Sequence, residues 1–503
     1  MWQPFTFPVA VLVIFFAILP GLAAAQDAPS ADGILPFDHQ LARLMNQFFC
    51  QTTPLLRVDI YDALPEAWTE EERRGLPVAV HDRRRVIGRH YGLTPTPPDV
   101  QEFPLGLVAG MTAGRAVLHA NCLLCHSGEL FGQPVVGLAN NRLDFEALMD
   151  DVLTVSQERR VPLSPWAVQY RAARRYGIRF NTTPGSTSPL SFASIFLALR
   201  NADLTHRQTV DGMDAFFDSV LASPLARRLG AETLVRRHAM FGMPDIDQDA
   251  PSWWLTRADS RLFVDGLIDK GGPSTMMFLA DPWIAADEIT DRLPHAREFV
   301  AHLDRVPLPP SYADAYPERV DAARVTSGSS LFAGHCGQCH GVYGSDPATD
   351  KYPGRIVALA EIGTDSRRAT GITDGFRAFL DASWFGQQGA LHTEMRATGY
   401  RAPYLRRVAY TFPYLHNGSI PTLYHVLFPE ERPDRWQVDP DHYDHDRLGQ
   451  QVDPRGREPA TARERRMIFD TSLPGKGKDG HDTILEPLSR AERLSILEYL
   501  KTL

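Results

Sequence analysis

Residues 121–127 read NCLLCHS and residues 335–341 read HCGQCHG, so one Cys-x-x-Cys-His pattern occurs twice, 214 residues apart. Two thiols three residues apart on a helix end lie on nearly the same face, where each can bond one vinyl group of a haem, and the next residue reaches the iron. The pattern therefore predicts two covalently attached c-type haems, held by Cys122, Cys125 and His126 and by Cys336, Cys339 and His340.

Three other interpretations compete with haem attachment: a zinc half-site, a thioredoxin-like redox pair, and coincidence. Zinc would need two pairs acting together, and it would not need a histidine directly after each pair. Both pairs here are followed by histidine, and two chance copies are improbable in a chain with 5 cysteines among 503 residues. His126 and His340 are therefore predicted to be the proximal iron ligands.

The composition is that of a soluble globular protein, with 44% hydrophobic and 22% charged residues, and the length favours two or three domains. The formal net charge of -9 is spread along the chain without a long basic run, which argues against a nucleic-acid partner. The fifth cysteine, Cys50, lies in the apolar stretch NQFFCQ and is interpreted as a buried free thiol without an assigned role.

Residues 1–25 contain no charged side chain and carry the apolar run VAVLVIFFAIL, which leads to Pro20 and Gly21. Ala23 and Ala25 are small residues of the kind that precede a signal-peptidase cleavage site. We expect an export signal cut before Gln26, and hence a mature chain in the periplasm or outside the cell. An uncleaved membrane anchor is the alternative, because the run approaches the length that spans a bilayer.

The rest of the chain is predicted to form three parts. Residues 26–104 are rich in proline and show no clear period, which favours an extended N-terminal arm on the body. A helical pattern begins at Leu105 and runs into the first cysteine pair, within a cytochrome c-like haem domain of residues 105–310. Residues 311–503, after Pro309 and Pro310, repeat a helix leading into a cysteine pair and form a second cytochrome c-like haem domain.

The chain ends in its clearest predicted helix, LSRAERLSILEYLKTL. Ser489 and Glu492 form a capping box, and leucines recur every third residue from Leu494 to Leu503 as one apolar stripe. A terminal amphipathic helix after such a motif suits a cytochrome c domain, in which it crosses the helix before the motif. Because strand signals are few, we expect a mainly α fold with two cytochrome c-like domains.

What lies opposite each proximal histidine decides between electron transfer and chemistry, because a second strong ligand closes the iron. The loop LPGKGKDGHD places His481 eight residues before the helix N-cap at Ser489, and its glycines let the backbone fold across a haem face. His481 is the predicted sixth ligand of the second haem. An exposed loop histidine is the simpler alternative, and His416, in PYLHNGS, is the main rival.

The first haem has no comparable loop. Its candidate ligands could equally be core or surface residues: Met240, Met243, His238 and His206. The stretch DAPSWWLTRADSRLFVDG is dense in aromatics, and Trp253, Trp254 and Phe263 could wall a distal pocket above an open iron. An aromatic core at helical spacing is an equally good interpretation of these three residues.

The segment from Tyr400 to Leu427, YRAPYLRRVAYTFPYLHNGSIPTLYHVL, resembles a signature of the bacterial di-haem cytochrome c peroxidase superfamily. That signature is shared by the peroxidases, by related enzymes that oxidise tryptophan on a partner protein, and by rubber oxygenases. The tail MIFDTSLPGKGKDGHD is most similar to the rubber oxygenase branch, whose members have such a loop supplying a histidine to the second haem. The resemblance covers nearly everything after the arm.

This resemblance implies that His340 and His481 share one iron, and that His416 is a structural histidine of the signature, close to the haems. Peroxidases instead supply a methionine from a loop beyond the signature; this chain reads FPEERPDRW there, which counts against a standard peroxidase. The same branch leaves the N-terminal haem without a strong distal ligand, with aromatic residues over the face where dioxygen sits. SWWLTR, NCLLCHSGE and GLANNRLDF resemble the corresponding stretches.

We therefore expect a periplasmic oxidoreductase in which the haem at His126 activates dioxygen or peroxide and the haem at His340 transfers electrons, with His416 a further candidate catalytic residue. The expected partners are that oxidant and an unknown organic substrate or small redox protein. One alternative is a cytochrome c peroxidase with a small cytochrome as donor. Another is a non-enzymatic electron-transfer protein. Calcium is a further candidate cofactor through the resemblance, although no sequence motif supports it.

Overall fold

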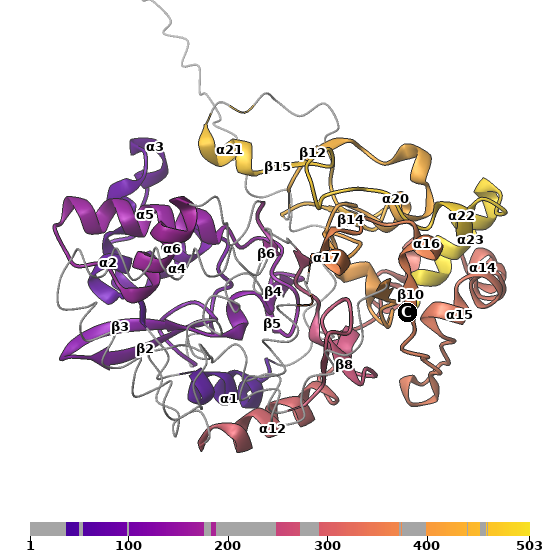
Figure 1. The fold of residues 1–503 in the computed structure, drawn as a ribbon, viewed down its shortest axis with the longest axis horizontal. Helices are drawn as coiled ribbons and strands as arrows, with labels where there is room; N and C mark the ends of the chain where they lie inside the picture. The colour runs from indigo at the N-terminus through magenta and orange to yellow at the C-terminus, as the bar shows by residue number, and fades with distance from the viewer. Residues whose placement is uncertain are drawn as a thin grey trace, which may run out of the picture.

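The computed structural model describes residues 37–49, 54–97, 100–175, 183–187, 248–271, 291–371, 374, 399–439, 441–452, 459 and 461–503. The predicted export segment, Cys50 and four candidate ligands of the first haem (His206, His238, Met240 and Met243) lie outside these residues. Within the described ranges, no helix is long and apolar enough to cross a membrane. In Figure 1 most elements before Pro309 lie on the left and most elements after it lie on the right.

A three-stranded antiparallel sheet leads into the first cysteine pair. Its strands are β1 (Pro54–Arg57), β2 (Leu107–Thr112) and β3 (Arg115–Ala120), in the order β1-β3-β2. The helix expected from Leu105 into this pair is therefore wrong. Ala113 and Gly114 both have positive φ, at 48° and 72°, and form a two-residue hairpin turn whose twist suits antiparallel strands.

Residues 37–104 differ from the extended arm expected for them, because their described part is largely helical and built into a core. Leu55, Ile60 and Tyr61 are fully buried there, together with Leu148 and Tyr170 from two later helices. Pro65 occupies the first turn of a short helix, a position that tolerates proline. The elements are α1 (His39–Phe49), α2 (Val58–Ala63), η3 (Leu64–Ala67), α3 (Glu70–Arg73), α4 (Val80–His90), α5 (Phe145–Glu158) and α6 (Pro165–Arg175).

A second core lies where α1 packs against α12 (Leu293–Leu303), at the bottom of Figure 1. Leu41 and Met45 of α1 are buried there with Trp253, Trp254 and other apolar residues. The remaining elements of this half are short: η4 (Cys122–Leu124), β4 (Ser127–Leu130), β5 (Gln133–Val136), β6 (Ser186–Thr187), β7 (Gln248–Asp249), η5 (Trp253–Thr256), β8 (Arg261–Leu262) and β9 (Ile268–Asp269).

The C-terminal half is organised around two helices, α14 (Ala322–His335) and α23 (Arg490–Leu500), which pack directly against each other. Ser489 caps α23 through the reciprocal hydrogen bonds of a capping box with Glu492, so the predicted helix start is confirmed. The helices approach so closely that a Cβ atom on Gly328 would lie 1.9 Å from the carbonyl oxygen of Ser495. This crossing brings the chain terminus against the helix that leads into the second cysteine pair.

The other elements of this half are short and connected by long loops. The helical ones are α13 (Tyr312–Ala315), η7 (Pro317–Arg319), α15 (Gly337–His340), η8 (Pro347–Thr349), α16 (Leu359–Ile362), α17 (Arg367–Thr370), η9 (Val408–Tyr410), α20 (Leu423–Leu427), η10 (Pro429–Glu431), α21 (Ala462–Arg466) and α22 (Asp482–Leu485). The strands form three antiparallel pairs: β10 (Ile356–Ala358) with β11 (Gly399–Arg401), β12 (Arg435–Gln437) with β15 (Ile468–Asp470), and β13 (Tyr443–Asp444) with β14 (Gly449–Gln450).

The described residues thus mix helices with small antiparallel sheets. The mainly α class, the two cytochrome c-like domains and their boundaries at residues 105–310 and 311–503 stay predictions. Several contacts join the two halves, among them the hydrogen bond from the Asp249 backbone nitrogen to the His416 carbonyl oxygen at 2.9 Å. The Arg401 nitrogen likewise donates to the Val264 carbonyl oxygen at 2.7 Å. Residues far apart in the sequence therefore meet at the centre of the molecule.

Candidate haem sites

The two cysteine motifs have the same backbone arrangement. The His126 nitrogen donates to the Cys122 carbonyl oxygen at 3.0 Å, and the His340 nitrogen donates to the Cys336 carbonyl oxygen at 2.9 Å. A second, slightly longer hydrogen bond inside each pair runs from the second cysteine nitrogen to the same carbonyl oxygen, at 3.2 and 3.1 Å. This single helical turn puts both thiols of a pair and the histidine on one side. All four cysteines are free thiols rather than disulfides.

Each motif histidine also uses its Nδ1 atom in the same way. His126 Nδ1 lies 3.0 Å from the Pro251 carbonyl oxygen, and His340 Nδ1 lies 3.0 Å from the Pro403 carbonyl oxygen. A carbonyl oxygen only accepts, so Nδ1 carries the proton in both rings and Nε2 keeps its lone pair. This is the tautomer of an imidazole that binds a metal through Nε2 and is oriented by a backbone acceptor.

Burial keeps the ligand groups neutral. It lowers the pKa of His126 to about 4, against a smaller upward effect of the Pro251 carbonyl, and it lowers the pKa of His340 as well. Burial also raises the pKa of the thiols of Cys122, Cys125 and Cys336 to about 12. The neutral imidazole is the form that binds iron, so both histidines are prepared as ligands.

His481 lies opposite His340. The two ring centroids are 6.3 Å apart and the ring planes differ by 15°. Two imidazoles bonded end to end through one metal put their centroids about 6 Å apart, since each metal–nitrogen bond is about 2 Å and each ring centre lies about 1 Å behind its nitrogen. Burial lowers the pKa of His481 to about 3, and its buried Nδ1 atom has no hydrogen-bond partner among the described residues. The pair therefore fits a haem iron held between two histidines.

His416, the rival ligand, lies elsewhere. Its ring stacks on Tyr400 with centroids 4.1 Å apart and planes 19° apart, and its Nε2 atom is buried without a hydrogen-bond partner. Burial lowers the pKa of His416 to about 3, so its ring is neutral. Within the described ranges, the histidine ring that faces His340 is that of His481. The geometry thus favours His481 as the sixth ligand and leaves His416 beside the centre of the molecule.

The aromatic residues proposed to cover the first haem do not share one position. Trp253 stacks beside the proximal histidine His126, with centroids 5.2 Å apart and planes 29° apart. Its backbone nitrogen donates to the Gly137 carbonyl oxygen, and the Gly137 nitrogen donates to the His126 carbonyl oxygen. Because a distal residue lies across the iron from the proximal imidazole, this contact favours the proximal side for Trp253 and differs from the distal role predicted for it.

Trp254 and Phe263 belong to the same core as Trp253. Trp254 is fully buried and its Nε1 atom has no hydrogen-bond partner among the described residues. Phe263 is partly buried and has a φ of 65°. The predicted place of these two rings over the first haem stays a prediction.

Two functional atoms were missed by sequence reasoning. The carbonyl oxygens of Pro251 and Pro403 orient the two proximal rings, but a backbone acceptor carries no side-chain signal. The two prolines share one feature that becomes clear only from the structure. Pro251 directly precedes SWWLTR and Pro403 lies inside the signature segment, and both of these stretches carry the resemblance.

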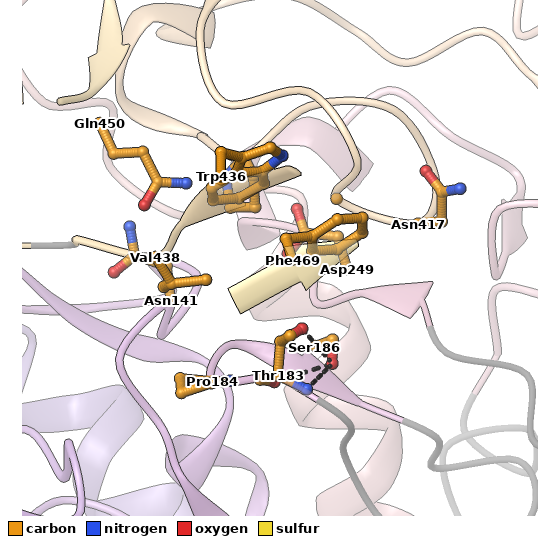
Figure 2. Close-up of a pocket in the computed structure, with 12 residues that line it drawn as sticks. Asn141, Thr183, Pro184, Ser186, Asp249, Asn417, Trp436, Val438, Gln450 and Phe469 are labelled. Atoms are coloured by element: carbon orange, nitrogen blue, oxygen red, sulfur yellow. Dashed lines mark hydrogen bonds between the residues drawn. The ribbon is translucent and has the colours of Figure 1, made fainter. Parts of the chain in front are cut away.

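A small cavity lies where the two halves meet (Figure 2). Its single carboxylate is that of Asp249, and burial raises the pKa of that group well above its usual range. Side chains from both halves line the cavity, including Asn141, Thr183, Ser186, Asn417 and Gln450. No group of three or more histidine, cysteine, aspartate or glutamate side chains that could hold a metal ion occurs within the described residues. Calcium therefore stays a prediction from the resemblance.

Comparison with known families supports the interpretation of the C-terminal half. Residues 399–437 match a family model described as RoxA-like, cytochrome c-like. The chain is similar to the RoxA-like cytochromes c. This match covers the whole signature segment, residues 400–427, and a cytochrome c-like domain implies a c-type haem with iron. A haem-binding cytochrome of this kind is consistent with an oxidoreductase in the general sense.

Two proteins of Sinorhizobium fredii (strain NBRC 101917 / NGR234) are also similar. The uncharacterized protein y4iM is 32% identical over 233 residues, which cover 39% of this chain and 51% of that protein. The uncharacterized protein y4iJ is 26% identical over 255 residues, covering 39% of this chain and 41% of that protein. The chain thus spans about half the length of these relatives.

Proposed function

We propose that this chain is an exported di-haem c-type cytochrome that acts as an oxidoreductase, within the wider di-haem peroxidase superfamily. In this proposal the N-terminal haem, attached at Cys122 and Cys125, activates dioxygen or peroxide. The C-terminal haem, attached at Cys336 and Cys339, transfers electrons. The proposal rests on the different surroundings of the two proximal histidines. His340 faces the imidazole of His481, whereas His126 has the indole of Trp253 at its side.

The roles follow from what each histidine can do. His340 and His481, as neutral imidazoles 6.3 Å apart and nearly parallel, would hold one iron with two strong ligands and leave it no free position for a reactant. His126 would hold the other iron from one side, with its ring clamped by the Pro251 carbonyl and by the face of Trp253. An iron with one strong ligand can supply oxidative chemistry on a small oxidant when haem is bound.

The absorption and electron paramagnetic resonance spectra of the purified holoprotein test this assignment. We expect one low-spin haem that ignores carbon monoxide and cyanide and one haem that binds them. Two low-spin haems that ignore both reagents would refute the catalytic assignment and leave a protein that only shuttles electrons. Mass spectrometry of the denatured chain counts the attached haems. Loss of one haem in the double variant Cys122→Ser/Cys125→Ser and of the other in Cys336→Ser/Cys339→Ser identifies each site.

Ligand substitution tests the C-terminal haem separately. His481→Ala should abolish the low-spin signal of that haem, whereas His416→Ala should retain it. The haem content of each variant must be measured, because either change can impair haem incorporation. The opposite result, with the signal lost only in His416→Ala, would show that the assignment of His481 is wrong.

Turnover assays distinguish dioxygen from peroxide as the oxidant. Oxygen uptake with an unsaturated lipid or polyisoprenoid would support dioxygen activation, and peroxide consumption with a reduced small cytochrome would support the peroxidase alternative. Since the relatives' names indicate no substrate and the matched segments cover part of each chain, the organic substrate is not assigned.

A further inference from the structure

The loop that carries His481 is held mainly by side chains from outside it. It connects β15 to α22, and in its last part, from Gly477 to Gly480, the structure shows no backbone hydrogen bond made within the loop. Gly475 and Gly480 have φ values of 81° and 133°, and His481 itself has a φ of 69°. Backbone in such conformations supplies little order of its own, so its carbonyl groups need external donors.

Those donors come from two buried side chains of residues 399–437, the stretch that matches the family model. Asn417 Nδ2 donates to the carbonyl oxygens of Gly475 and Gly477, at 3.1 and 3.0 Å. Arg432 donates to the carbonyl oxygens of the two residues that follow along the loop, Lys478 and Gly480, both at 2.8 Å. Four loop carbonyls are thus bound by two side chains, and the two nearest His481 belong to Arg432.

Arg432 ties this loop to a fixed element. Its Nε atom donates to the His425 carbonyl oxygen at 2.8 Å and its Nη2 atom to the Val426 carbonyl oxygen at 3.0 Å, both in α20. The guanidinium thus bridges the carbonyl groups of α20 and those of the loop, and Nη1 reaches the Asp482 carboxylate at 3.3 Å. All five N–H groups of the arginine have an acceptor, and the residue is buried.

We propose that Arg432 is a positioning residue that holds His481 at the distance from His340 at which both imidazoles bind one iron. The inference rests on the proposed function, because it presupposes a haem between these histidines. Arg432 touches neither ring in this arrangement. It acts by fixing the carbonyl groups on either side of Asp479, one residue before the ligand.

Lysine cannot replace this arrangement. An ammonium group is a compact donor on a flexible stem, whereas the planar guanidinium presents its donors in a fixed fork that reaches two elements at once. Outer groups that orient a metal ligand typically contribute about ten- to a hundred-fold to metal affinity. We therefore expect both Arg432→Lys and Arg432→Gln to weaken the bond between His481 and iron while His340 still holds the haem.

The test compares full-length holoproteins that carry Arg432→Gln, Arg432→Lys or the control Arg435→Gln. Arg435 is an exposed arginine of the same segment, paired with Asp470 at 3.5 Å. In both Arg432 variants the low-spin signal of the C-terminal haem should fall, carbon monoxide should bind that haem at least about ten times faster than in the wild type, and added imidazole should restore the low-spin signal. Arg435→Gln should behave as wild type.

The inference is overturned if folded Arg432 variants, with full haem content and wild-type circular dichroism, keep the complete low-spin signal and the resistance to carbon monoxide. Lower thermal stability alone would then show that Arg432 is only structural. If neither Arg432 variant folds, Asp482→Ala decides in the same way, since it removes a half-exposed acceptor of both Arg432 and the Gly480 nitrogen.

His481→Ala separates this inference from the proposed function. If that variant keeps the low-spin signal, the ligand assignment itself is wrong, and the Arg432 inference falls with it. If His481→Ala loses the signal while the Arg432 variants keep it, only the role of Arg432 is refuted.

Discussion

Replacing Gly328 by alanine should destabilise the C-terminal half, because this glycine lies at the closest approach of α14 and α23. The added Cβ atom would meet the Ser495 carbonyl oxygen at 1.9 Å and the Ser495 carbonyl carbon at 2.5 Å. Ordinary contacts begin at 3.4 Å, and the obstructing atoms are backbone, which cannot rotate away. The helices would therefore have to separate by about 1.5 Å at this point.

The expected loss is about 2 kcal/mol. Overpacking of this kind costs about 1–3 kcal/mol, and a backbone obstacle puts Gly328→Ala at the upper end. Alanine returns about 1 kcal/mol through its better helix propensity. For a unit of about 150–250 residues, a loss of about 2 kcal/mol corresponds to a fall in Tm of about 4–8 °C.

Gly334→Ala is the matched control. Gly334 lies in the same helix, and a Cβ atom there would meet nothing within 4 Å. The propensity gain is then unopposed, so Tm should stay level or rise. Thermal unfolding of the holoproteins, followed by circular dichroism and by haem absorbance, measures both. Equal Tm values for the two variants would refute the steric reasoning.

Three further changes test other parts of the molecule. Trp253→Ala removes the ring beside His126 and should lower the free energy of unfolding in urea by about 3–5 kcal/mol. It should also shift the reduction potential of the N-terminal haem. An unchanged potential would show that Trp253 stabilises the fold without orienting His126. Asp265→Asn leaves the guanidinium of Arg368 buried without its bidentate partner, and should cost about 3–5 kcal/mol by the same assay; a loss below about 1 kcal/mol would contradict this. Burial lowers the pKa of His90 to about 4, so the unfolded state takes up the proton first and stability should be lost as the pH falls from about 6.5 towards 4. His90→Gln should flatten that part of the stability profile, and an unchanged slope in unfolding at several pH values would count against it.

The features predicted correctly from the sequence are those that short segments encode. The start of α23 needs a serine and a glutamate three residues apart before an apolar stripe, and all of that information lies within one turn. The signature segment was likewise recognised from contiguous residues, and the RoxA-like match falls on the same part of the chain. Local signals of this kind do not depend on contacts with distant parts of the chain.

The errors arose where tertiary context decides. The residues from Leu105 to Asn121 were interpreted as a helical pattern, yet Ala113 and Gly114 adopt the positive φ values of a hairpin turn. In the described part of residues 37–104, α1 packs against α12, and α2 packs in one core with α5 and α6. β3 likewise pairs with β1, more than fifty residues earlier in the chain. In both regions a partner of the segment is distant in sequence.

The position of Trp253 had the same difficulty. Aromatic density predicted a wall around a haem, but sequence cannot tell which side of the iron a residue will occupy. The side follows from the hydrogen bond between His126 and the Pro251 carbonyl, since that bond draws residues 251–256 alongside the proximal ring. The position of Trp253 thus depends on the Pro251 carbonyl oxygen, and no side-chain pattern in the sequence indicates that acceptor.

The two proximal histidines have nearly identical hydrogen bonds, so a functional difference between the two haem sites must arise elsewhere. In both motifs the histidine nitrogen donates to the carbonyl oxygen of the first cysteine, and Nδ1 of the ring lies beside the carbonyl oxygen of a proline. Ligand basicity set by these bonds should then be similar for the two irons, so a difference in reactivity has to come from the opposite faces. At the C-terminal site that face is His481, whose loop depends on Asn417 of the signature segment and on Arg432, which follows it. Both residues lie in the stretch 399–437 that matches the family model, so that stretch would act on the haem indirectly, by holding a ligand more than forty residues further along the chain.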